Sequence, residues 1–408
     1  MNVLLLTQVL PYPPDSGPKV KTWNLIKWLA AEGHSVTLVS FVRGESVRAL
    51  DALRPYLRAV HAVPMRRGAL RDGAALLASL VSGRPFVMVR DDRAAMRHLV
   101  ERVGRATRFD IAHADQLNMA QYAQRVPGAA RVLDTHNALW VLYRRLAGIT
   151  RMGPRRALLE REWRRLRQYE GAVCRVFDAV VAVTEEDRRA LGEASGGGRE
   201  TAVVPIAVDP DELRPVQRRP DADRIVHLGT MYWPPNGDGV RWFAQAVLPR
   251  IRAARPGTGF DVLGARPPRH VRALARAGSG VHVAGHVADP LPYLERAAVM
   301  IVPIRAGSGM RVKILTALAQ GLAVVSTAAG CAGIDVQPET HLLVADTADA
   351  FAEATLRLLG DRPLADALGR NGRRLIETRY DYRQVYAQWR PVYERLARAS
   401  ADPVRKTA

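Results

Sequence analysis

The sequence is poor in cysteine and has no long hydrophobic run. Of its 408 residues only Cys174 and Cys331 are cysteines, and neither has a second cysteine or a close histidine at the spacing of a metal site. We therefore expect two reduced thiols in a cytoplasmic protein and no metal site. No run approaches the roughly 20 apolar residues that a membrane-spanning helix needs. The early run VLLLTQVL lacks a basic leader and a cleavage site, so we interpret it as a buried strand rather than a signal peptide.

Lysine is scarce, although the chain is strongly basic. Only five of the 60 basic residues are lysines, 55 are arginines, and the net charge is +20. GC-rich coding produces such a skew without any function. The alternative is attraction to anionic partners such as nucleotide-sugars, anionic lipid or nucleic acid. Aromatic and basic residues are not interleaved as in stacking platforms for nucleic acid, so we expect no nucleic-acid partner.

Short apolar runs alternate with longer amphipathic runs along the chain. This alternation predicts the α/β class, with parallel sheets covered on both faces. A polar, proline-containing stretch near residues 200–222 interrupts the pattern, which then restarts. We predict two doubly wound Rossmann-like domains that face a cleft, at residues 1–200 and 201–372. A single long helical run is predicted from Arg373 to Ala399, and we expect this C-terminal helical segment, residues 373–408, to pack back on the first domain.

The most informative stretch is PIRAGSGMRVKILTALAQGLAVVST, residues 303–327. It predicts a buried strand, a glycine loop at 307–309, a helix that ends at Gly321, and a second buried strand. Arg311 and Lys313 fall in the predicted first turn of the helix. Because a helix N-terminus already favours anions, two cations beside it indicate a phosphate or diphosphate ligand. The loop follows the carboxyl end of a strand, where open α/β sheets bind ligands.

Essentially the whole chain resembles the retaining glycosyltransferases of family 4. The second half contains LGTMYWPPN and the stretch quoted above, where a bacterial branch of that family reads roughly GSMDWPPN and PLRxGxGTRLKxLEAMAxGxPVVST. The first half contains PYPPDSG, DTHNALW and CRVFDAVVAVTEEDRRAL at matching places. The resemblance implies the GT-B fold and a hexosyltransferase. Such an enzyme moves a sugar from a nucleotide-sugar to a hydroxyl acceptor with retained configuration, and we expect no cofactor.

The resemblance also assigns roles to residues. His136 matches an active-site histidine near the reacting sugar, and Arg311 and Lys313 match cations that hold the departing diphosphate. Acceptor-side and donor-binding candidates follow from the same match. They are, on the acceptor side, Gly17, Lys19, His113 and Asp115, and, for the donor, Gly229, Thr230, Arg305, Gly307, Ser308, Gly309, Met310, Thr316, His286 and Val287. Core histidines, a solvated basic turn and ordinary loop turns are the structural alternatives.

Two positions depart from the family's pattern. Thr316 stands where members usually have a glutamate that holds the donor ribose hydroxyls, and Pro18 stands where a second glycine is usual. A threonine hydroxyl cannot grip two ribose hydroxyls at once. We expect a dTDP- or UDP-linked donor. The threonine indicates either a dTDP-sugar, which lacks the 2′-hydroxyl, or donor binding that is weak or abolished. A catalytically impaired binding or partner protein is the alternative function. A GT-B epimerase is disfavoured because the sequence assembles no pair of carboxylates with a histidine.

The sequence leaves the acceptor open. A small molecule, a lipid-linked carrier and a saccharide all fit, as do natural-product and polysaccharide biosynthesis. The segment 153–174 is basic and amphipathic, which is typical of a helix on anionic lipid and also of an ordinary surface helix. We expect a cytoplasmic protein, and a peripheral contact with the inner membrane face stays an open alternative.

Overall fold

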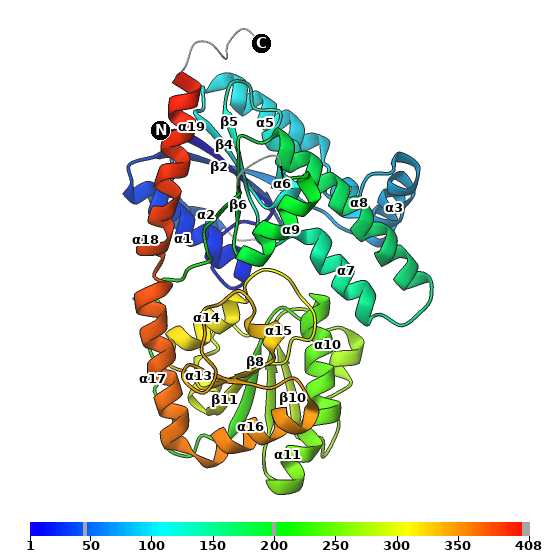
Figure 1. Cartoon of the computed structure of the whole chain (residues 1–408), viewed down its shortest axis with the longest axis vertical. Coiled ribbons are helices and arrows are strands. Elements are labelled where there is room, and N and C mark those ends of the chain that lie inside the picture. Colours follow the sequence, from blue (N-terminus) through cyan, green and yellow to red (C-terminus); the bar gives the residue numbers. More distant parts are fainter. Residues whose placement is uncertain (44–46, 198–200, 402–408) are drawn as a thin grey trace. The chain divides into compact units, whose positions relative to one another are not determined.

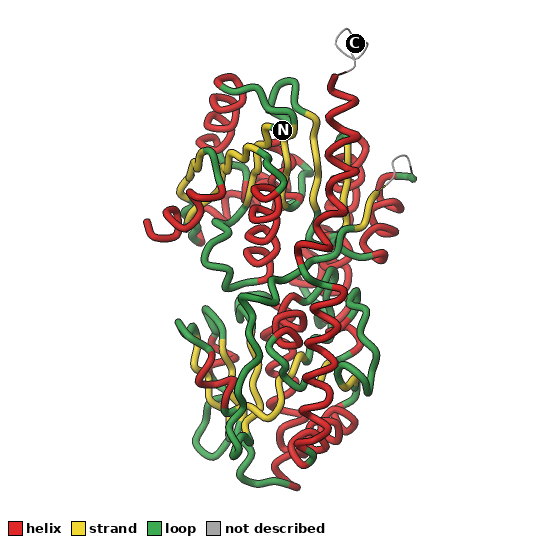
Figure 2. Tube along the Cα trace, turned by 90° about the vertical axis from the view of Figure 1, so that its left-hand side faces the viewer, coloured by secondary structure: helices red, strands yellow, loops and turns green. Residues whose placement is uncertain are grey.

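A computed structural model describes residues 1–43, 47–197 and 201–401 of the chain. Its contacts divide the chain into two compact units. The first comprises Met1–Ile206, Ser308–Met310 and the residues from Tyr382 on, and the second comprises Ala207–Gly307 and Arg311–Asp381. Each unit is an α/β layer structure, and Figure 2 shows strands lying between helices in both.

The first unit contains a seven-stranded sheet in the order β3-β2-β1-β4-β5-β6-β7, and all neighbouring strands are parallel. Every residue of β1 after Asn2 is buried, as the uninterrupted apolar run predicts. The strands are β1 (Asn2–Thr7), β2 (Ser35–Val42), β3 (Ala59–Pro64), β4 (Ile111–Asp115), β5 (Ala130–Asp134), β6 (Ala179–Ala182) and β7 (Thr201–Val203).

Helices follow the strands of the first sheet and cover it (Figure 1). The helices before β7 are α1 (Gly17–Ala31), α2 (Val47–Leu53), α3 (Ala69–Ser82), α4 (Phe86–Asp91), α5 (Ala94–Ala106), α6 (Leu117–Ala123), α7 (Leu139–Ile149), α8 (Pro154–Val176) and α9 (Glu185–Ser195). From the end of the chain come α18 (Tyr382–Val385) and α19 (Trp389–Ala401), joined by a 3₁₀ turn. Tyr386, Trp389 and Tyr393 of this last segment are buried in the first unit.

The second unit contains a six-stranded parallel sheet in the order β10-β9-β8-β11-β12-β13. Its strands are β8 (Arg224–Leu228), β9 (Phe260–Leu263), β10 (Val281–Gly285), β11 (Ala297–Val302), β12 (Val324–Ser326) and β13 (Leu343–Val344). Its helices are α10 (Pro234–Trp242), α11 (Leu248–Ala254), α12 (Arg269–Arg272), α13 (Leu291–Glu295), α14 (Val312–Ala319), α15 (Ala328–Cys331), α16 (Ala348–Gly360) and α17 (Arg362–Arg379).

The two sheets confirm the predicted α/β class with two doubly wound parallel sheets. In each sheet the strand order reverses once, between β1 and β4 in the first and between β8 and β11 in the second. Because the loops on either side of a reversal turn away from each other, the carboxyl ends of these strands leave room for a ligand. The loops that follow these four strands are therefore the places to examine for a site.

The single helical run predicted from Arg373 to Ala399 is wrong. The structure has α17 ending at Arg379, and a new helix starts at Tyr382. The break occurs because Tyr380 and Asp381 bind elsewhere: the Tyr380 carbonyl accepts from the Val208 amide, and Asp381 forms a parallel bridge with Val208. None of the described helices is long and apolar enough to cross a membrane.

Candidate functional site

Lys313 and its neighbours form a polar cluster at the strand reversal of the second sheet. Lys313 lies in the first turn of α14, which follows β11, and its partners come from β8 and from α10. Gly229, the first residue after β8, allows the ammonium to approach. A Cβ there would lie 2.7 Å from the Asn236 side-chain nitrogen and closer still to Lys313 Nζ. The loop thus needs glycine at this position for steric reasons.

Two uncharged groups hold the Lys313 ammonium. Lys313 Nζ donates to Asn236 Oδ1 at 2.7 Å and lies 3.3 Å from His227 Nε2. The ring of His227 is oriented by the Ile301 carbonyl, which lies 2.9 Å from Nδ1 and can only accept. Nδ1 therefore carries the proton, and Nε2 accepts from the lysine. Since an ammonium has three N–H groups, this arrangement leaves the third for a ligand.

The surroundings disfavour charge on both titratable members of the cluster. Burial, together with the nearby charge of Arg311, lowers the pKa of Lys313 to about 7. Burial and the Lys313 ammonium hold the pKa of His227 well below its usual range, so this ring is neutral. Within the described residues no carboxylate pairs with Lys313. The lysine is therefore poised to gain from a bound anion.

Arg311 lies beside Lys313 but outside the helix. It is the N-cap residue of α14 rather than a member of its first turn, which corrects the predicted boundary. Arg311 is 5% exposed, its guanidinium lies 5.9 Å from the centre of the Trp233 ring, and its Nη2 lies 3.4 Å from the Ala329 carbonyl. Gly307 leaves room for this guanidinium. A Cβ at position 307 would lie 2.7 Å from Arg311 Nη2, which is too close.

Arg305 has a partner within its own unit. Its Nε and Nη2 contact both oxygens of Asp238 at 2.8–3.0 Å, a bidentate ion pair at the protein surface. A phosphate contact by Arg305 stays a prediction, and it requires competition with Asp238. Thr230 lies in the loop after β8, next to Gly229, and its carbonyl accepts from Asn236 Nδ2 at 2.9 Å.

The other donor-side candidates lie in three places. Thr316 donates its hydroxyl to the Lys313 carbonyl at 3.1 Å, one turn back along α14. His286 and Val287 follow β10, and the first of these is exposed. The contacts group Ser308, Gly309 and Met310 with the first unit rather than the second, and Gly309 has a left-handed backbone with φ 72°. The donor-binding roles of these residues stay predictions.

His136 of the first unit has both ring nitrogens engaged. Its Nε2 lies 2.7 Å from Asp115 Oδ1, and its Nδ1 lies 3.1 Å from Gln116 Nε2. Asp115 is the last residue of β4, is almost fully buried and also accepts from the Thr22 hydroxyl at 2.8 Å. A carboxylate accepts and an amide nitrogen donates, so Nε2 carries the proton and Nδ1 is the acceptor. The predicted contact of His136 with a sugar requires Gln116 to move aside.

A second buried group surrounds Asp134, the last residue of β5. Asp134 forms an ion pair with Lys21 of α1, and both side chains are at most 2% exposed. His113 Nε2 lies 3.3 Å from Asp134, and His113 Nδ1 lies 2.7 Å from the Tyr393 hydroxyl. Burial alone raises the pKa of Asp134, but Lys21 and His113 outweigh it and lower the pKa to about 2. His113 is fully buried, which favours its interpretation as a core histidine over an acceptor contact.

Potential ligand atoms of Asp115, Asp134 and His136 lie within 4.8 Å of one another, so the fold assembles two carboxylates with a histidine, a combination that the sequence analysis did not find. The Lys21 ammonium already pairs with Asp134, and the His136 proton and Thr22 hydroxyl already use Asp115. These contacts favour an internal ion-pair network over a metal site. The other two acceptor-side candidates lie at the start of α1: Gly17 is its first residue, and Lys19 pairs with Asp15 at 3.1 Å.

His227 is the functional candidate that the sequence analysis missed. It lies in the middle of the apolar run RIVHLG, and a histidine in a buried strand resembles any satisfied core histidine. Its place in the sequence could have indicated it, because His227 precedes Gly229, the first residue after the strand, by two residues. Its contact with Lys313 joins residues 86 positions apart, so only the fold brings them together.

Two models of glycosyltransferase families match the chain. Residues 16–212 match the model described as Glycosyltransferase Family 4, and residues 222–361 match the model described as Glycosyl transferases group 1. The first match contains strands β2 to β7 of the first sheet, and the second contains strands β8 to β13 of the second sheet. A search of the curated proteins found no match.

Solved glycosyltransferase structures share the fold. Sucrose-phosphate synthase from Thermosynechococcus elongatus aligns with a TM-score of 0.72 at 17% identity, covering 98% of this chain and 100% of that one. Anabaena HepE, solved with UDP and glucose, aligns with a TM-score of 0.66 at 15% identity, covering 97% and 100%. A TarM variant from S. aureus, bound to UDP, α-GlcNAc-glycerol and fondaparinux, aligns with a TM-score of 0.69 at 10% identity, covering 96% and 99%. The protein has the GT-B fold of these glycosyltransferases.

Proposed function

We propose that the protein is a retaining glycosyltransferase that moves a hexose from a nucleotide-sugar donor to a hydroxyl group of an acceptor. The observation that carries this proposal is the Lys313 ammonium, which Asn236 and His227 hold and which has no carboxylate partner among the residues that the structure describes. The two family models agree with it, as does the fold shared with proteins solved with UDP. The remaining elements, retention and the hydroxyl acceptor, rest on the sequence resemblance.

The cluster fits the electrostatic demand of sugar transfer. As the bond between the sugar and the diphosphate breaks, negative charge develops on the leaving oxygen. We assign the stabilisation of that charge to Lys313 and Arg311 at the start of α14, because fixed cations act without reorganising. Their positions are set by neighbours rather than by flexible loops, because Gly229 and Gly307 leave the space that the two side chains fill. We assign the first-unit candidates around His136 to the acceptor side.

The nucleotide is tested by a thermal-shift screen of the full chain against UDP, dTDP, GDP and ADP. We expect stabilisation by UDP or dTDP, because a ligand that binds only the folded state raises its stability. Failure of all four to stabilise the protein would overturn the proposal. A donor-hydrolysis assay tests the alternative of an impaired binding protein. A working transferase transfers some sugar to water, whereas a binding protein releases none.

Thr316 bears on the choice between UDP and dTDP. Its hydroxyl donates to the Lys313 carbonyl, which leaves only its acceptor capacity for a ribose. We propose a donor whose ribose needs one hydrogen bond, as in a dTDP-sugar. Thr316→Glu then shifts the ratio of kcat/KM values for UDP- and dTDP-linked glucose toward UDP. A clear UDP preference of the unchanged protein refutes the dTDP assignment without affecting the transferase assignment.

One face of α3 supports a peripheral contact with anionic membrane at the cytoplasmic side. Leu70, Leu77 and Val81 lie on one side of the helix at 67–92% exposure, and the exposed Arg66 and Arg71 lie at its start. An apolar stripe with adjoining cations suits the interface of an anionic bilayer. Pelleting with anionic vesicles tests the contact. We expect Val81→Asp to reduce pelleting, and equal pelleting with neutral vesicles contradicts it.

A further inference from the structure

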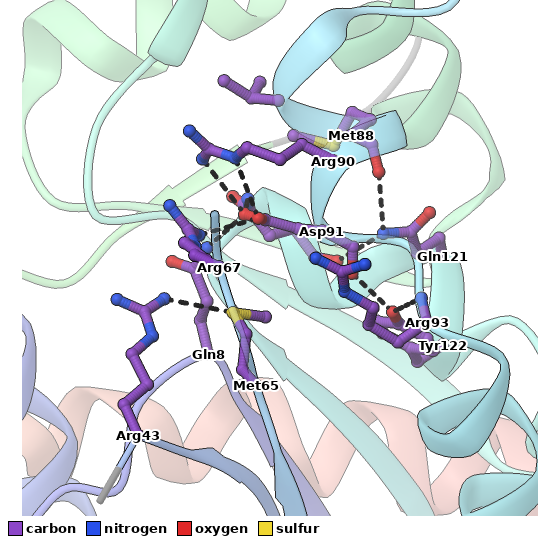
Figure 3. Close-up of polar contacts among 12 residues, drawn as sticks. Gln8, Arg43, Met65, Arg67, Met88, Arg90, Asp91, Arg93, Gln121 and Tyr122 are labelled. Carbon is purple, nitrogen blue, oxygen red and sulfur yellow. Dashed lines mark hydrogen bonds and ion pairs between the residues drawn. The ribbon is translucent and has the colours of Figure 1, made fainter. Parts of the chain in front are cut away.

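A cluster of arginines surrounds one buried carboxylate in the first unit (Figure 3). Asp91 is the last residue of α4 and is 1% exposed. Gln8 follows β1, Arg43 follows β2, and Arg67 lies three residues after the end of β3. The cluster therefore lies at the carboxyl ends of three parallel strands, the edge of the sheet at which ligands bind in open α/β folds.

Asp91 fixes two of these arginines by direct bonds. Arg67 Nη2 donates to Asp91 Oδ1 at 2.7 Å, and Arg90 donates to both oxygens, through Nε at 3.1 Å and through Nη2 at 3.4 Å. Gln8 and Asn118 also donate amide protons to Asp91 Oδ2. The carboxylate has no remaining capacity, so it acts as an anchor that orients the two guanidinium groups.

The guanidinium groups have donors to spare. A guanidinium carries five N–H groups. Among the described residues Arg67 uses only Nη2, and Arg90 leaves Nη1 without a protein acceptor. Both side chains stay accessible, Arg67 at 30% and Arg90 at 21% exposure. These donors therefore face water or a ligand.

The charge of Arg67 is disfavoured by its surroundings. Burial lowers the pKa of Arg67, and the charges of Arg90 and Arg43 add to that effect, whereas Asp91 and Asp72 oppose it. An anion bound to Arg67 would act in the same direction as these two carboxylates and would favour its charge.

We infer that Arg67 and Arg90, oriented by Asp91, bind a phosphate or carboxylate group of the acceptor. The inference rests on the proposed function, since only a transferase needs an acceptor. The fork of donors on arginine matches the paired oxygens of both anions. The sugar-accepting hydroxyl then belongs to an anionic molecule, which narrows the three acceptor classes to their phosphorylated or acidic members.

The test measures anion binding by the full chain with calorimetry. The probes are phenyl phosphate, benzoate and the neutral phenyl glucoside, each added with saturating UDP so that a phosphate site near Lys313 is filled. We expect phenyl phosphate or benzoate to bind and phenyl glucoside to bind at least tenfold more weakly. The stronger of the two anions identifies the acceptor's charged group.

Arg67→Gln and Arg66→Gln form a matched pair, because Arg66 is an exposed neighbour in the sequence and the hydrogen bonds to Asp91 among the described residues come from other side chains. We expect Arg67→Gln to weaken anion binding about tenfold or more, and Arg66→Gln to change it less than about twofold; tenfold corresponds to about 1.4 kcal/mol. UDP affinity and the thermal midpoint show whether each variant is folded.

The inference is overturned if neither anion binds, or if Arg67→Gln and Arg66→Gln weaken binding equally. Failure of UDP to bind is a separate result, because it removes the proposed function. In that case the anion titration is repeated with Lys313→Met. Binding that still depends on Arg67 then leaves an anion site in a protein of another function.

Discussion

Two lysines, one in each unit, lie beside a strand reversal, and they are held in opposite ways. Lys21 forms an ion pair with Asp134, where both side chains are almost fully buried. In the part of the chain that the structure describes, Lys313 contacts only the uncharged acceptors His227 and Asn236. The charge of Lys21 is therefore neutralised inside the protein, whereas we propose that a ligand balances that of Lys313. The difference separates a lysine paired within the fold from one that we assign to the proposed site.

The largest expected effect concerns Lys21. Lys21→Met leaves Asp134 buried without its main partner, which should lower the free energy of unfolding by about 3–5 kcal/mol. Urea denaturation measures this change. Lys19→Met is the control, because Lys19 pairs with the exposed Asp15 and should cost about 1 kcal/mol or less. An equal loss in both variants would contradict a structural role specific to Lys21.

Lys313→Met should act on catalysis instead of stability. Loss of a fixed cation at the leaving group should lower kcat/KM about 10²–10³-fold. The free energy of unfolding should stay the same or increase, because burial disfavours the charge of Lys313 in the folded protein. Steady-state kinetics and urea denaturation of one preparation test both parts. A destabilised variant with nearly normal turnover would make Lys313 a second structural lysine.

The smallest expected effect is a dependence of nucleotide binding on pH. In the protein without a ligand, burial and the charge of Arg311 lower the pKa of Lys313 to about 7. A bound diphosphate favours the protonated form of Lys313. Above pH 7 binding must take up a proton, so the UDP affinity should fall with rising pH, at most about tenfold per unit. Calorimetry in buffers of different ionisation enthalpy measures the uptake. Lys313→Met, in which only UDP itself titrates, should show none above pH 8.

Much of the fold follows from local patterns in the sequence. Apolar runs such as NVLLLT predict buried parallel strands, and the glycine loop after β11 predicts the turn before α14. The break between α17 and α18 does not follow, because Tyr380 and Asp381 leave the helix for contacts with Val208, far away in the chain. Helical periodicity depends on neighbouring residues only, so it cannot predict a helix break that a distant residue causes.

The candidate site also has one part that the sequence predicts and another part that depends on the fold. Arg311 and Lys313 are visible in the sequence, since cations after a glycine loop indicate phosphate binding. The role of His227 depends on the pairing of β8 with β11, which places Ile301 and Lys313 on either side of its ring. The hydrogen bonds of Asp91 likewise bring together side chains from four separate segments. Contacts between residues so far apart in the sequence form only when the sheet has formed.

The glycine at position 229 offers a way to separate shape from charge. Gly229→Ala adds a single methyl group to the loop and alters no titratable residue, yet that methyl occupies the place of the lysine ammonium. Because the backbone at Gly229 has φ +159°, where alanine is strained, a loss of nucleotide binding in this variant reports the shape of the loop and of its side chains rather than a change of charge. The sequence draws attention to the cations of this site, but the position of the Lys313 ammonium also depends on the missing side chain at Gly229.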